Sequence, residues 1–136
     1  DGPHEGALRQ LAKGKNVHFL GRRERQDCLE LISQSSALLL LSTADENGFN
    51  AEALGLCLLE AAALGVPVIG SKCGGIPEAI GTGLLIDAET DISLVEDFLA
   101  DEDAGRKAWE WLKDNHGLDR CVSFLLRLRK NSSGEN

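Results

Sequence analysis

The stretch EALGLCLLEAAALGVPVIG, residues 52–70, decides the fold because it joins a helical pattern directly to a strand pattern. Ala53 to Leu64 is almost wholly apolar, which predicts a buried helix that Gly65 and Pro67 end. Val66 to Gly70 is short and apolar, which predicts a buried strand. A helix followed at once by such a strand is typical of a βαβ unit with a parallel sheet.

The same alternation continues on both sides of this stretch. The pattern predicts strands at Val17–Leu20, Ala37–Leu41 and Leu84–Ile86, helices at Arg25–Ser35 and Pro77–Ile80, a loop at Ser42–Asn50, and two or three amphipathic helices between Ile92 and Leu128. The predicted fold is α/β, a Rossmann-like, doubly wound parallel sheet with C-terminal helices. Ligands bind such sheets at the carboxyl ends of the strands, so the loops after Leu41 and Gly70 and the turn after Leu20 should share one rim.

Composition excludes several classes of protein. The 136 residues fit one domain or a piece of one, expected over residues 1–130 with a frayed tail at 131–136. With 14 Lys and Arg against 22 Asp and Glu, the net charge of −8 disfavours nonspecific nucleic-acid binding. No apolar run approaches a membrane span in length, and no cysteines have zinc-ligand spacing. We expect the four cysteines to be small buried residues in a reducing cytoplasm: Cys28, Cys57, Cys73 and Cys121.

Glu60 is unusual because it interrupts the apolar helix. Burying an ionised carboxylate costs on the order of several kcal/mol of free energy unless the charge is paired or hydrogen-bonded. Two interpretations remain open. Glu60 either lies at the helix edge or caps a neighbouring loop, or it accepts hydrogen bonds from a ligand such as a sugar or ribose diol.

Glu52 lies eight residues earlier, just ahead of Gly55, and would stand about 12 Å away along a helix. A helix that begins near Gly55 would present free N–H groups to an anion, and glycine leaves space for its approach. Gly74 and Gly75 could add further N–H groups to a diphosphate, although a glycine pair alone is more often a tight turn.

Five segments in order resemble the retaining GT-B glycosyltransferases of group 1, also called family 4. The residues Glu52 to Glu60 resemble the family's E-x7-E motif. The other segments are AAALGVPVI at residues 61–69, GGIPE at 74–78, GLLI at 83–86 and VHFLG at 17–21, preceded by Asp1-Gly2-Pro3, which resembles the end of a GDGP turn. The resemblance implies that the chain is the C-terminal, donor-binding half of a GT-B fold, truncated at its N-terminus.

The resemblance also implies residue roles. Glu52 would contact the transferred sugar as the candidate catalytic residue, and Glu60 would bind the ribose diol. Backbone N–H groups of Leu54, Gly55 and Leu56 would face sugar or phosphate, Gly74 and Gly75 would approach the diphosphate, and Gly21 and Arg22 would border the base. The donor would be a UDP-, GDP- or ADP-sugar, with no metal and no other cofactor. Polysaccharide or glycolipid synthesis, by hexosyl transfer with retention, is the expected setting.

The resemblance leaves a second interpretation, a non-catalytic scaffold module derived from this fold. The sequence has no counterpart of the family's diphosphate-binding Arg and Lys or of its N-terminal acceptor domain. Lys72 is a candidate replacement for these cations, but the pattern favours a solvent-exposed lysine at a strand end. A generic dinucleotide binder is disfavoured because no GxGxxG follows a strand. Exposed sheet edges would allow pairing with another chain. The expected location is cytoplasmic, with peripheral membrane attachment only through other parts.

Overall fold

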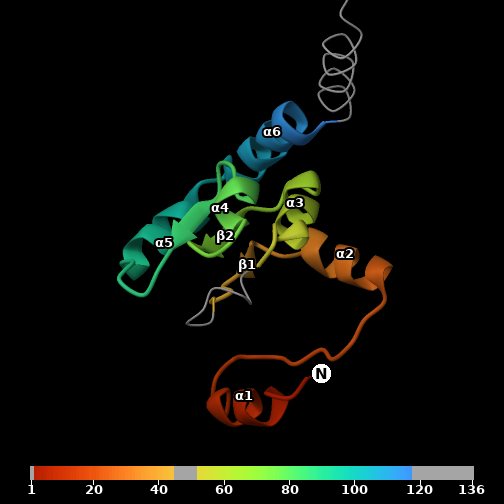
Figure 1. The fold of residues 1–136 in the computed structure, drawn as a ribbon, viewed down its shortest axis with the longest axis vertical. Helices are drawn as coiled ribbons and strands as arrows, with labels where there is room; N and C mark the ends of the chain where they lie inside the picture. Colours follow the sequence, from red (N-terminus) through yellow and green to blue (C-terminus); the bar gives the residue numbers. More distant parts are fainter. Residues whose placement is uncertain (1, 45–51, 118–136) are drawn as a thin grey trace, which may run out of the picture.

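The computed structural model describes residues 2–44 and 52–117, and its centre is a parallel sheet of three strands (Figure 1). The strands are β1 (Leu38–Leu40), β2 (Val68–Ser71) and β3 (Leu84–Ile86), in the order β1-β2-β3. Leu39 lies beside Ile69, which lies beside Leu84. The described part therefore has the predicted α/β architecture, a Rossmann-like parallel sheet with helices.

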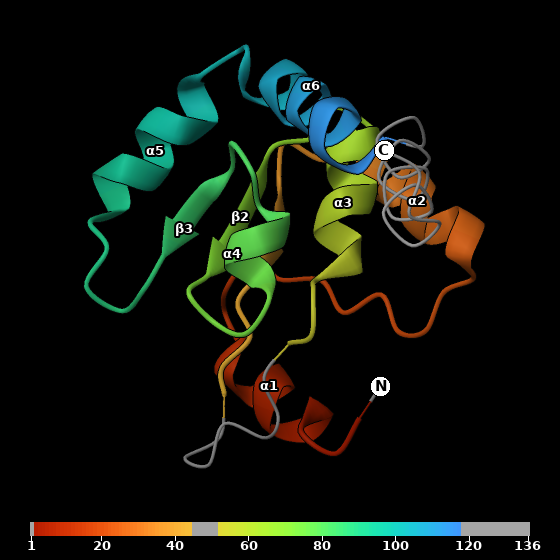
Figure 2. The ribbon, with the colours of Figure 1, turned by 45° about the horizontal axis from the view of Figure 1, so that its top comes forward.

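Six helices accompany the sheet in the described part of the chain. They are α1 (Glu5–Leu11), α2 (Arg25–Ser33), α3 (Leu56–Ala63), α4 (Ile76–Ala79), α5 (Ile92–Ala100) and α6 (Ala104–His116). The connection from β1 to β2 runs through α3, and the one from β2 to β3 runs through α4, so each pair of neighbouring strands forms a βαβ unit (Figure 2).

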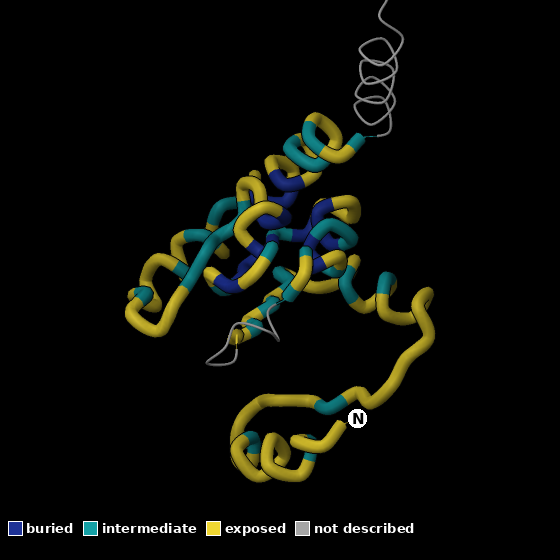
Figure 3. Tube along the Cα trace, in the orientation of Figure 1, coloured by how far each residue is buried: buried dark blue, intermediate teal, exposed yellow. Residues whose placement is uncertain are grey.

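The core lies between α3, the sheet, α4 and α6 (Figure 3). Leu58 of α3, Ile69 of β2 and Ile76 of α4 are fully buried. Helix α6 comes so close to the end of α3 that a Cβ on Gly105 would lie 1.9 Å from the carbonyl oxygen of Gly65. This packing fixes α3 against the sheet, and α3 carries most of the predicted site residues.

Two predicted boundaries move, each for a backbone reason. Helix α3 begins at Leu56 rather than Ala53 because Gly55 takes a left-handed conformation, with φ +76°, and forms the N-cap. Strand β2 begins at Val68 rather than Val66 because the Val66 N–H donates to the Ala61 carbonyl at the end of α3, and Pro67 has no N–H to donate.

The predicted strand at Val17–Leu20 is wrong. These residues form no regular element, and about half of Val17 and of Leu20 is exposed. The turn after Leu20 therefore does not belong to the sheet's rim. Figure 1 shows this stretch joining α1 to α2 at a distance from the three strands, where nothing in the described part pairs with its backbone as a strand partner. A strand is stable only with a neighbour, so apolar composition alone misled the prediction.

Single side chains also differ from expectation. Cys28 is exposed rather than buried, whereas Cys73 is buried. Trp109 is 44% exposed, so it is not a core residue. Trp111 packs as predicted, because its ring covers Gly81, where a Cβ would lie 2.2 Å from a ring carbon. Predictions for the loop residues 45–50 and for Phe124, Leu125, Cys121 and the tail lie outside the described residues.

Candidate functional site at the carboxyl edge of the sheet

The carboxyl ends of all three strands meet along one edge of the sheet, because the strands are parallel. This edge holds a cavity of about 310 Å³. Residues that end or follow each strand line it: Leu41, Thr43, Ser71, Ile86, Asp87 and Ala88. The Ser71 hydroxyl donates to the Ser42 carbonyl and so ties the end of β2 to the chain that leaves β1. The loops after Leu41 and Gly70 thus share a rim, as predicted.

The turn before α3 is closed by Glu52. Its carboxylate Oε1 accepts a hydrogen bond of 3.1 Å from the Gly55 N–H, which places a negative charge at the N-terminus of the helix. A Cβ on Gly55 would come within about 3 Å of Leu40 and Leu58, so both the left-handed φ and the tight packing require glycine. The next two N–H groups, of Leu56 and Cys57, belong to the first helical turn and have no acceptor within the helix.

Gly74 and Gly75 lie directly against this turn. The Gly75 N–H donates to the Glu52 carbonyl at 2.8 Å. A Cβ on Gly74 would be 2.0 Å from the Glu52 carbonyl oxygen, and one on Gly75 would be 2.0 Å from that of Ala53. The expectation that the Gly75 N–H is free for a diphosphate is therefore corrected. The glycine pair allows two loops to touch, and it holds the backbone of Glu52 in place.

Glu60 is not fully buried, contrary to the expectation of a helix enclosed on all sides. Its side chain is 28% exposed, and Oε1 lies 2.7 Å from Nη1 of Arg25. No local sequence pattern indicates Arg25, because its partner is 35 positions away and only the packing of α2 against α3 brings the two together. Of the two interpretations left open, the position at the helix edge describes the observed surroundings, and an ion pair satisfies the carboxylate.

The remaining predicted residues divide into two groups. Leu54 and Leu56 flank Gly55 in the turn before α3. Leu54 packs against the core, whereas Leu56 is 65% exposed at the start of the helix. Gly21 and Arg22 lie on the exposed stretch between α1 and α2, and a Cβ on Gly21 would meet nothing within 4 Å. The structure thus gathers residues 52–56, 74 and 75, and leaves the two predicted base-binding residues apart.

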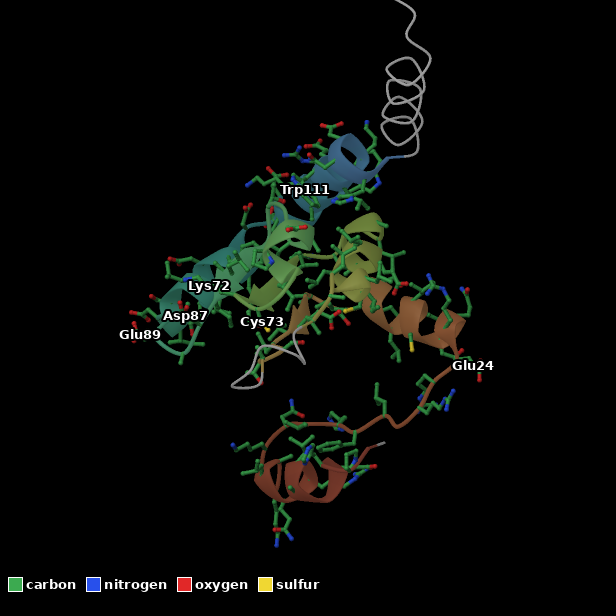
Figure 4. The ribbon with its side chains drawn as sticks, in the orientation of Figure 1. Glu24, Lys72, Cys73, Asp87, Glu89 and Trp111 are labelled. Carbon is green, nitrogen blue, oxygen red and sulfur yellow. The ribbon has the colours of Figure 1, made fainter. Side chains whose placement is uncertain are left out.

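Lys72 and Asp87 form an ion pair across the same edge of the sheet (Figure 4). Lys72 Nζ lies 2.7 Å from Asp87 Oδ2, and the Thr90 hydroxyl donates to Oδ1 at 2.9 Å. These hydrogen bonds, that from Lys72 foremost, lower the pKa of the Asp87 carboxyl to about 2. Because its charge is already paired, Lys72 is a poor candidate for neutralising a diphosphate. The sequence offered no signal for Asp87, whose partner lies 15 positions away.

Comparison with known proteins decides the family. The profile of the family described as "Glycosyl transferases group 1" matches residues 5–122, which is most of the chain. The chain belongs to this family. The recognition made from the five sequence segments is therefore confirmed, and the parallel sheet is that of a GT-B half.

Individual group 1 relatives agree with this assignment. A GDP-mannose-dependent monoacylated alpha-(1-6)-phosphatidylinositol monomannoside mannosyltransferase of Corynebacterium glutamicum is 36% identical over 102 residues, 72% of this chain and 26% of the relative. An N-acetyl-alpha-D-glucosaminyl L-malate synthase of Bacillus anthracis is 34% identical over 137 aligned positions, 90% of this chain and 34% of the relative. The chain thus spans between a quarter and about a third of these glycosyltransferases.

The Cys57 thiol lies within the group 1 motif, between Glu52 and Glu60. Partial burial, followed by the nearby charge of Glu52, raises the pKa of Cys57.

Over residues 2–44 and 52–117 there is no group of three or more His, Cys, Asp and Glu side chains placed to hold a metal ion. In the same residues no helix has the length and apolar character needed to cross a bilayer.

Proposed function

We propose that this chain binds the nucleotide-sugar donor of a retaining glycosyltransferase, and that the donor lies across the N-terminus of α3. The observation that carries the proposal is the arrangement at this helix end. Glu52 closes the turn on one side, the first-turn N–H groups of Leu56 and Cys57 follow without a carbonyl acceptor in the helix, and Glu60 stands three residues beyond Cys57. This order of groups suits a sugar, a diphosphate and a ribose in succession.

The chemistry of each part supports that order. A diphosphate is stabilised by the helix N–H groups and the positive end of the helix dipole, which also favour it as a leaving group. Glu60 lies about 6 Å beyond Leu56 along the helix axis and offers carboxylate oxygens to the two ribose hydroxyls. We assign Glu52 to the hydroxyls of the transferred sugar, where it positions the sugar and acts electrostatically.

GDP is the first nucleotide to test because three relatives are named as GDP-mannose-dependent. UDP and ADP are the alternatives. Roles for Gly21 and Arg22 at the base require their stretch to approach α3, and they remain predictions. We place the acceptor site on a domain beyond the part described, of the kind that completes the longer relatives, and a lipid or polysaccharide acceptor is part of the same proposal.

Calorimetric titration with GDP, UDP and ADP tests the proposal. We expect one of the three to bind, and Glu60→Gln to weaken it about 10- to 150-fold, the usual effect of a lost charged hydrogen bond. Glu96→Gln, on the exposed face of α5, is the control and should leave affinity unchanged. If a folded sample binds none of the three nucleotides, the proposal is wrong and the scaffold interpretation gains.

A further inference from the structure

The ion pair between Arg25 and Glu60 joins two helices that are distant in sequence. Arg25 is the first residue of α2, Glu60 lies in the second half of α3, and their side chains meet at 2.7 Å. The Arg25 side chain is 74% exposed, whereas the Glu60 side chain is only 28% exposed. Arg25 therefore reaches from solvent onto a half-buried carboxylate.

This ion pair differs from the others in the described part of the chain. Each of the other pairs joins side chains that are at least one-third exposed, and most link neighbours within six positions on one helix or turn. Glu60 is the least exposed carboxylate among them. Because Arg25 is largely exposed, the ion pair contributes little to the free energy of unfolding. Its main effect is on the position of the Glu60 carboxylate oxygens.

Recognition of a ribose diol makes a geometric demand on the carboxylate. The two adjacent hydroxyls each donate a hydrogen bond, and a carboxylate with two oxygens can accept both only in a fixed orientation. The ion pair brings Nη1 of Arg25 to Oε1 of Glu60, and the diol would use Oε2 and the remaining lone pairs of the carboxylate. When a nucleotide covers Glu60 and removes its water, the guanidinium would also keep its charge paired.

We infer that Arg25 is a positioning residue for the nucleotide's ribose, which acts by holding the Glu60 carboxylate in the orientation that the diol requires. The inference rests on the proposed function, because Glu60 must face a ribose for the orientation to matter. It differs from a structural role for Arg25, in which removal of the side chain would affect folding and leave ribose selectivity unchanged. It differs equally from a blocking role, in which removal of Arg25 would tighten binding.

The test compares a ribonucleotide with its 2′-deoxy form on the 136-residue chain. GDP and 2′-deoxy-GDP, or the UDP or ADP pair if that base binds, are titrated into wild type, Arg25→Gln and Arg25→Lys. We expect Arg25→Gln to weaken the ribonucleotide about 3- to 10-fold and the deoxy form much less, so that the selectivity ratio falls. Arg25→Lys keeps one charged donor and should restore part of the ratio.

Arg23→Gln is the matched control, since it removes the same charge two residues earlier from an exposed position. It should keep both affinities, and thermal unfolding should show that all variants are folded. If wild type binds no nucleotide, the proposed function fails and the inference with it. If wild type prefers ribose and Arg25→Gln keeps that ratio or binds more tightly, the inference alone is overturned. Binding by wild type without any ribose preference also overturns it.

Discussion

Gly75 links the two loops that form the candidate site. Its N–H bonds the Glu52 carbonyl, and the space where a side chain would start is taken by the Ala53 carbonyl. The sequence predicted that Gly74 and Gly75 offer N–H groups to a diphosphate, and it could not separate this role from close approach because both select glycine. The structure favours close approach, and only the packed backbone of residues 52–54 could reveal it.

Replacing Gly75 with alanine should therefore separate the two loops. The new Cβ would stand 2.0 Å from a backbone oxygen, and we expect the free energy of unfolding to fall by about 1–3 kcal/mol, as for other overpacked sites. Gly6→Ala in α1 is the control, because a Cβ there meets nothing within 4 Å. Urea unfolding followed by the fluorescence of Trp109 and Trp111 measures both. Equal stability of the two variants would contradict this account of Gly75.

Glu60 shows what sequence can and cannot say about a single charge. Its apolar neighbours correctly indicated that a partner was needed. The identity of the partner depended on how α2 crosses α3, which no local pattern encodes. The same limit applies to Asp87, which pairs with Lys72 only because β2 and β3 are neighbours.

At the scale of elements, the strand predictions succeeded for the apolar runs that have a neighbouring strand in the described residues, and failed for Val17–Leu20, which has none. All three strands and the helices α2 to α6 lie within or close to their predicted ranges. Boundaries moved where backbone details decided them, as with the left-handed Gly55 at the start of α3. Helix α1 was not predicted, and it has no buried residue that would have given it an apolar pattern to detect.

The ion pair that joins the ends of β2 and β3 predicts a specific acid response. The Asp87 pKa is about 2 when folded against an ordinary 3.8, so the folded state binds fewer protons between these values. The stabilising effect of Asp87 is thus complete above pH 3.8 and is lost as pH falls toward 2. Asp87→Asn should make the decline of unfolding free energy over this interval shallower.

Urea unfolding at several pH values between 2 and 5 measures this slope, and an NMR titration of the Asp87 carboxyl checks the pKa directly. Asp97→Asn, on the exposed surface of α5, is the control for removal of one carboxylate. If Asp87→Asn and Asp97→Asn give the same slope as wild type, the Lys72–Asp87 pair does not lower the Asp87 pKa as described.

At the scale of the whole molecule, the described residues comprise a packed part that carries the site and an N-terminal stretch, residues 2–20, without buried residues. Residues 38–44 and 52–117 contain the sheet, the core and the gathered site residues, whereas α1 has no buried residue and Val17 and Leu20 are half exposed. Leu39 of β1, which lies at one end of the described sheet, is 55% exposed as well. Family membership could be recognised from the order of the five segments, although one of them, VHFLG, does not form its expected strand.

The central claim, that a nucleotide diphosphate lies across the N-terminus of α3, is tested most directly by amide chemical-shift mapping. The ¹⁵N-labelled chain is titrated with whichever of GDP, UDP and ADP binds most tightly. We predict that the largest shifts fall on residues 54–60 and 72–75, and that α5 and α1 change little. Shifts absent at saturating nucleotide, or concentrated on α1 or α5, would contradict the claim.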